Sequence, residues 1–359
     1  MRSLSICSTL LSACCMLSET QAAPLDSLTT ADTGLNRGEF RTDIGFDTMN
    51  HTLDFLHLQS GQGVSSDTGN YSGIHLGLEV AVSDAWVVQF IYQDRFKLVY
   101  NRDNETVKSW QVAAKYRLTQ DRNAAAQFSA RLGAWGDYSN ALVNNRQETI
   151  NDWTLNDIVI SKPHDRQVQL DMIGAFKLPA DLALNTFASV GHSIVSGGQE
   201  SAYHNNCNYS FTFGLKGVYG ELSSPPACGG TAPLLVNFSA SNVLEDMSYT
   251  AIYGELGGLM QWHPDNSRFT IRGGYQFETL NRDRVDGVVA GNHHQPYKTN
   301  HILLGETVVN VTEGSAMYLR GQLMMHQYAG EIPMLYDSFT AKGFNLKSGL
   351  FSIGLYSRF

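Results

Sequence analysis

Residues 351–359 alternate apolar with small or polar side chains to the end of the chain. The apolar residues are Phe351, Ile353, Leu355 and Phe359. A period of two places these side chains on one face of a β-strand. Because a strand at a sheet edge leaves backbone groups unpaired, it needs a partner. The pattern therefore predicts a final strand that pairs with the first strand of a barrel.

The same four apolar residues resemble the C-terminal signal of Gram-negative outer-membrane β-barrel proteins, which the barrel assembly machinery reads. Ser357 departs from that signal, in which an aromatic or larger apolar residue is usual at this position. The resemblance covers residues 351–359 and the general strand pattern, and it names a class without a specific family. It implies a protein of the bacterial outer membrane that contacts the lipids of that membrane.

Composition agrees with a membrane barrel. Only 16% of the 359 residues are charged, against about 25% in ordinary soluble domains. Glycine is frequent and 11% of the residues are aromatic, which suits a barrel wall. Beyond the N-terminal segment, no stretch approaches the roughly 20 apolar residues of a membrane helix. We therefore expect an all-β fold, a transmembrane antiparallel β-barrel.

The N-terminal residues 1–22 are predicted to be a signal peptide, with Arg2 before an apolar run and small residues before the cleavage site. A segment that resembles a lipobox ends at Cys14, so lipidation there is the alternative. Residues 23–38 are expected to form a short periplasmic lead, and residues 39–359 the barrel.

Alternating segments recur along the chain, and short connections between them alternate with long polar ones. Residues 74–82 and 86–92 form the first such pair. With one opening strand, at 40–48 or 52–60, the count is twelve. An even number closes a single-chain bacterial barrel, with short periplasmic turns and long outer loops. Both termini are then expected in the periplasm.

The longest connection contains two more strand-like segments, 211–215 and 234–238, and counting them would give fourteen strands. Twelve is preferred because Cys207 and Cys228 then share one outer loop. Two such cysteines usually form a disulfide in an oxidising compartment. No metal site is expected, since the CxxC spacing of zinc sites is absent.

Residues between the outward apolar positions are expected to line the pore. The ionisable ones are Arg95, Lys97, Lys115, Arg117, Arg131, Lys177, Arg268, Arg272, Arg320, Arg358, Glu79, Asp171, Glu255, Glu278 and Glu306. Basic residues outnumber acidic ones among them, although the chain carries a net charge of -9. Basic rings in a pore favour anions. The alternative is that these charges pair with one another across the strands.

The sequence favours a porin-like channel for small solutes. We expect no enzymatic activity, no catalytic residue and no cofactor. A barrel enzyme acting on lipids and a surface structural or adhesive barrel are the alternatives. His192 and Ser193 are adjacent in a predicted strand, so they point to opposite faces and cannot form a catalytic pair alone. His293 and His294 lie in an outer loop without a carboxylate or cysteine at ligand spacing. No nucleic-acid partner is expected, and the oligomeric state is open.

Overall fold

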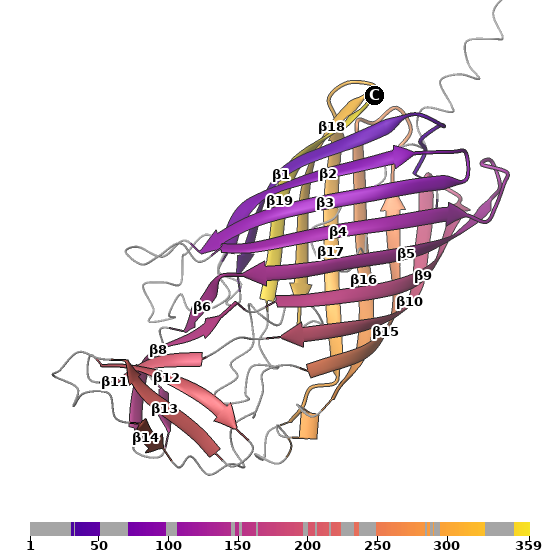
Figure 1. The fold of residues 1–359 in the computed structure, drawn as a ribbon. Helices are drawn as coiled ribbons and strands as arrows, with labels where there is room; N and C mark the ends of the chain where they lie inside the picture. Colours follow the sequence, from indigo (N-terminus) through magenta and orange to yellow (C-terminus); the bar gives the residue numbers. More distant parts are fainter. Residues whose placement is uncertain are drawn as a thin grey trace, which may run out of the picture.

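Twelve strands form a closed antiparallel barrel (Figure 1). The computed structural model describes residues 30–31, 33–50, 71–97, 106–144, 148–150, 153–162, 164–196, 200–204, 207–214, 217–223, 233–236, 249–283, 286–287, 290, 295–326 and 348–359. Around the barrel the strands are β1 (Phe40–Asn50), β19 (Ser348–Arg358), β18 (Ser315–Met324), β17 (Thr299–Asn310), β16 (Phe269–Arg282), β15 (Tyr249–Trp262), β10 (Leu182–Ser196), β9 (His164–Leu178), β5 (Ala126–Ser139), β4 (Thr106–Arg117), β3 (Trp86–Lys97) and β2 (Tyr71–Ala81). The twelve-strand prediction is confirmed, with the opening strand at the first of its two candidate positions.

Short turns lie at one end of the barrel, which we call the short-turn mouth. They comprise residues 82–85, 118–125, 179–181, 263–268 and 311–314. Phe40 lies at the same end, because it pairs with Val80 beside the first short turn, and Phe359 lies there too, because its backbone is hydrogen-bonded to that of Phe40. The longer connections lie at the other end. This is the predicted alternation of connection lengths.

A second sheet lies beyond the end of the barrel opposite the C-terminus (Figure 1). Its strands are β6 (Ala141–Asn144), β8 (Trp153–Ser161), β11 (Glu200–His204), β12 (Cys207–Gly214), β13 (Gly217–Ser223) and β14 (Pro233–Val236), with β7 (Glu148–Ile150) paired to β8. We call it the outer sheet. The segments that would have raised the count to fourteen coincide largely with β12 and β14, so they do form strands but not strands of the wall. Cys228 lies outside the described residues, and the disulfide with Cys207 stays a prediction.

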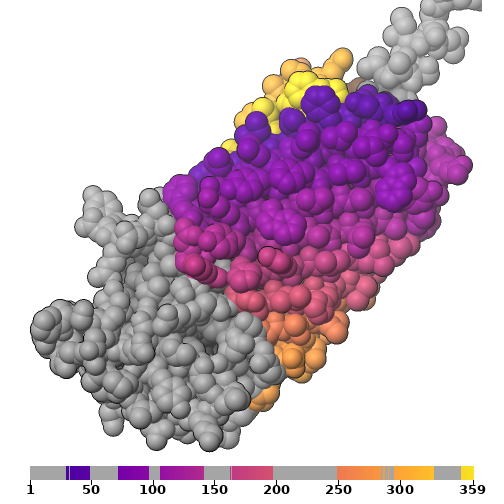
Figure 2. Space-filling view, in the orientation of Figure 1, coloured from indigo at the N-terminus to yellow at the C-terminus, as the bar shows by residue number. Residues whose placement is uncertain are grey.

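The outer face of the wall is apolar. Leu76 on β2 and Leu170 on β9 are 46% and 48% exposed. Figure 2 shows the continuous outer surface that β1 to β5 contribute. Trp86 and Trp262, next to short turns, and Trp110, near the opposite end of β4, are also exposed, as in the aromatic girdles of membrane barrels. Exposed apolar residues over buried charged ones make this a membrane-spanning wall.

No helix in the described part of the chain is long and apolar enough to cross a membrane.

The barrel closes between its first and last strands. Phe40 donates its backbone N–H to the carbonyl of Phe359 over 3.1 Å, and Phe359 donates to the carbonyl of Phe40 over 2.9 Å. The two rings stack with centroids 5.1 Å apart. Ile353 and Leu355 are exposed on the outer face, and Phe351 is half-buried. The final strand therefore pairs with the first, as its alternating pattern predicts.

Deleting Phe359 should lower the yield of folded barrel, because closure loses two hydrogen bonds and a ring stack worth about 0.5 to 1.5 kcal/mol beyond its buried area. The measurement is the fraction of heat-modifiable protein in outer-membrane preparations. Phe96→Ala removes an exposed aromatic residue of β3 away from the closure, and we expect it to have less effect. Equal yields for the wild type and the deletion would show that closure does not need Phe359.

Candidate functional site

The inside of the barrel is densely charged. The buried basic residues of the described part are Arg41, Arg95, Lys115, Arg131, Arg272, Arg282 and Arg320. The buried acidic residues are Asp43, Asp47, Glu79, Asp137, Asp165, Asp171, Glu255, Glu278, Asp286 and Glu306. Acidic residues are therefore in excess, whereas the sequence pattern gave an excess of basic ones.

This difference has an identifiable cause. The sequence reading left the facing of the opening strand unassigned and so omitted Asp43 and Asp47, which alternate with apolar residues of β1. Asp137 and Asp165 are also absent from the predicted pore-lining residues, although β5 and β9 extend far enough to include them. The longer strands bring these carboxylates to the inner face.

Most of the predicted pore-lining residues face inward and are buried. They are Arg95, Lys115, Arg131, Arg272, Arg320, Glu79, Glu255 and Glu278, together with Asp171 and Glu306. Arg117 is half-buried near the short-turn mouth, and Arg268 is exposed in the turn before β16. Lys177 is also exposed, and Arg358 is partly exposed. The side chain of Lys97 lies outside the described part.

Ion pairs link neighbouring strands on the inner face of the wall. Arg272 on β16 donates from Nη1 to Oε1 of Glu306 on β17 over 2.9 Å, and Arg320 on β18 donates from Nη2 to Oε2 of the same carboxylate over 2.6 Å. Arg131 Nε and Asp171 Oδ2 lie 2.6 Å apart across β5 and β9. These contacts match the alternative in which basic and acidic residues pair with one another.

A buried histidine joins strands on both sides of the closure. His75 Nδ1 lies 2.8 Å from Asp47 Oδ2, and Nε2 lies 3.1 Å from Asp43 Oδ2 and 2.6 Å from Tyr318 Oη. Tyr318 also donates to Asp43 Oδ1 over 3.0 Å. These residues come from β1, β2 and β18. The sequence reading missed the cluster, although the alternation of β1 would have placed both aspartates inward.

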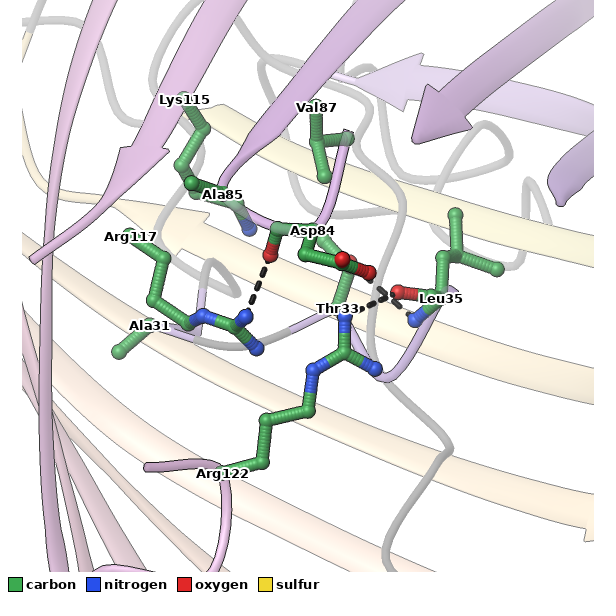
Figure 3. A pocket seen from close by; sticks show the side chains of 9 residues that line it. All are labelled: Ala31, Thr33, Leu35, Asp84, Ala85, Val87, Lys115, Arg117 and Arg122. Carbon is green, nitrogen blue, oxygen red and sulfur yellow. Dashed lines mark hydrogen bonds between the residues drawn. The ribbon is translucent and has the colours of Figure 1, made fainter. Parts of the chain in front are cut away.

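Residues 30–31 and 33–36 cross the inside of the short-turn mouth, and we call them the strap. Lys115 donates from Nζ to the carbonyl of Thr30 over 3.0 Å, and Arg122 donates from Nη2 to the carbonyl of Leu35 over 2.8 Å. Figure 3 shows Arg122 directed at the strap, while Arg117 donates to the backbone carbonyl of Asp84 instead. Two cations of the wall and its turn thus hold the strap by its backbone.

The two ends of the strap pack against different parts of the wall. Ala31 forms a buried cluster with Ile173 and Phe187 on β9 and β10. Leu35 packs against Ala81 and Val87, at the end of β2 and the start of β3. A cavity of about 10 Å³ beside the strap has room for about one water molecule. The part of the predicted periplasmic lead that the structure describes therefore lies within the mouth.

The strap joins β1 through a bend at Gly38, which has a φ of 85° and donates its N–H to Ala81 O over 2.8 Å. Such a positive φ favours glycine. Asn36 donates its backbone N–H to Glu39 Oε2 over 2.7 Å, and Arg358 lies 2.5 Å from the same oxygen. Burial opposes ionisation of Glu39, but the Asn36 hydrogen bonds and the Arg358 charge outweigh it and lower the pKa of Glu39.

His192 and Ser193 lie on opposite faces of the wall, as expected for neighbours in one strand. His192 is exposed on the outer face of β10, whereas Ser193 is buried inside. His293 and His294 lie outside the described residues. Within the described ranges, no group of three or more His, Cys, Asp and Glu residues could hold a metal ion.

No family model and no curated protein matches this chain. Among solved structures, it is similar to a NanC porin at 12% identity and a TM-score of 0.41, covering 88% of this chain and 98% of that one. The translocator domain of the autotransporter NalP from Neisseria meningitidis is 9% identical, with a TM-score of 0.46 and coverage of 89% and 88%. Outer membrane phospholipase A from Escherichia coli is 7% identical, with a TM-score of 0.33 and coverage of 88% and 92%. These proteins are named for different activities, so the likenesses do not indicate a function for this chain.

Replacing Glu306 with Gln should destabilise the barrel by about 3 to 5 kcal/mol, because Arg272 and Arg320 would lose their shared buried counter-charge. Urea unfolding of protein reconstituted in phospholipid vesicles measures the loss. Glu313→Gln, in an exposed turn, is the matched control and should stay within about 0.5 kcal/mol of the wild type. If Glu306→Gln also changed the unfolding free energy this little, the cluster of Arg272, Glu306 and Arg320 would not contribute to stability.

Proposed function

We propose that this protein is a gated outer-membrane channel for small polar solutes and that the strap is its gate. The observation that carries the proposal is the strap itself. It crosses the mouth inside the wall, and its contacts there include hydrogen bonds to two of its carbonyls and two small apolar clusters. Because these contacts are non-covalent, we expect that the strap can leave the mouth without unfolding the wall.

The inner face supports passage of polar molecules, since charged residues line it on many strands. The acidic excess favours a preference for cations over anions, so we do not retain the anion preference that the sequence pattern suggested. We infer that the short-turn mouth faces the periplasm, because short turns lie on that side in outer-membrane barrels. Both termini of the barrel would then be periplasmic, with assembly through the barrel assembly machinery.

A second candidate function is display of a binding surface at the cell exterior. The observation in its favour is the outer sheet, which is built from two long connections and lies beyond the wall. A display protein needs no conducting lumen. Ion conductance therefore discriminates between the two functions, and lipid hydrolysis by the purified protein would instead identify an enzyme.

Leu35→Asp should open the gate, because it replaces the apolar contacts of Leu35 with Ala81 and Val87 by a carboxylate that is costly to desolvate there. We expect a several-fold rise in mean conductance of the refolded protein in planar bilayers. Arg37→Asp adds an acidic side chain at an exposed position just beyond the strap and should leave conductance near the wild-type value.

A disulfide between Leu35→Cys and Ala81→Cys tests the same gate in the opposite direction. Oxidation should hold conductance at its lowest level, reduction should restore it, and each single cysteine variant should be insensitive. A channel that conducts equally with the strap cross-linked would refute gating by the strap. No conductance from any of these variants would refute the channel itself.

A further inference from the structure

Two carboxylates face each other inside the barrel. Glu255 on β15 and Glu278 on β16 are directly opposed in the strand register, and both are buried. Residues opposite each other on one face of an antiparallel pair have Cβ atoms about 4.5 to 5.5 Å apart. Two carboxyl groups at this separation do not both ionise readily away from water, unless a cation lies between or beside them.

Glu255 differs from the other buried carboxylates described above. Glu306, Asp171 and Glu79 each pair with an arginine. Within the part of the chain that the structure describes, neither oxygen of Glu255 accepts a hydrogen bond, although the residue is only 3% exposed. Burying a carboxylate that accepts no hydrogen bond is costly, so a cationic group that donates hydrogen bonds to Glu255 would be stabilised at this position.

The residues beside Glu255 in the strand register are polar or acidic. Its neighbour in the register on β10 is Ser189, whose hydroxyl has no hydrogen-bond partner among the described residues. Beyond Ser189 lies Asp171, a third carboxylate in the same row. Arg131 is the cation that acts on Glu255 electrostatically, and it already forms an ion pair with Asp171.

We propose that Glu255 and Glu278 form a lumen binding site for an organic cation that carries a guanidinium or primary ammonium group. A metal ion is disfavoured because two carboxylates provide fewer protein ligands than metal sites generally use. Guanidinium groups donate several hydrogen bonds to carboxylates, as Arg272 and Arg320 do to Glu306 in this lumen. The site rests on the proposed channel, since a solute must enter the lumen to reach it.

Methylguanidinium is a suitable probe, and uncharged methylurea has nearly the same shape. Titration calorimetry on refolded Leu35→Asp protein, in which the mouth is open, should detect binding of methylguanidinium and not of methylurea. Glu255→Gln and Glu278→Gln should each weaken binding roughly tenfold, because each removes a charge-assisted interaction. Glu255→Asp keeps the charge and should retain measurable binding. Heat-modifiable mobility confirms that each variant is folded.

Glu313→Gln is the control for carboxylates outside the lumen, and it should bind as tightly as its parent. Undiminished binding in both Glu255→Gln and Glu278→Gln would place the probe elsewhere and overturn the site, as would equal binding of methylurea or no binding at all. Bilayer conductance of the same samples separates the two proposals. Conductance without probe binding at Glu255 refutes the site alone, and probe binding without conductance refutes the channel alone.

Discussion

The structure depends on the need to keep charge away from lipid. A charged side chain on the outer face of a membrane barrel costs roughly 2 to 4 kcal/mol at the bilayer midplane. The wall therefore directs its apolar residues outward and its buried charged residues inward. Neighbouring strands bring opposite charges together inside, where they form ion pairs such as Arg131 with Asp171 and Arg272 with Glu306.

Inward charge also reinforces barrel closure. The backbone register between β1 and β19 closes the wall, and inward groups add contacts across the same region. His75 and Tyr318 connect β2 to β18 through Asp43 on β1. Arg320, also on β18, holds Glu306 on β17 and donates to Tyr356 Oη on β19 over 2.6 Å. Removing one partner of such a cluster leaves the others buried and unsatisfied, so the closure region is sensitive to single substitutions.

The wall could be predicted from the sequence because a period of two is a strong signal and a membrane barrel reverses the usual hydrophobic pattern. The terminal strand through Phe359 and the inward facing of Arg131 and Arg272 followed directly from it. The ion pairs were harder to predict, since residues such as Asp137 lie beyond the apolar part of their strands, where the alternation no longer indicates their facing. The strap had no periodic signal, because residues such as Ala31 and Leu35 are held through backbone carbonyls and isolated apolar contacts.

The central claim is that a polar lumen lies behind a removable strap. Gln111→Cys would place a thiol on the inner face of β4, deeper than Lys115. In proteoliposomes treated with a membrane-impermeant thiol reagent, we expect slow labelling of this cysteine when the strap is intact and much faster labelling when Leu35→Asp is present. Labelling of the chain without Gln111→Cys gives the background from native cysteines. Equal labelling rates with and without Leu35→Asp, whether fast or absent, would contradict the account.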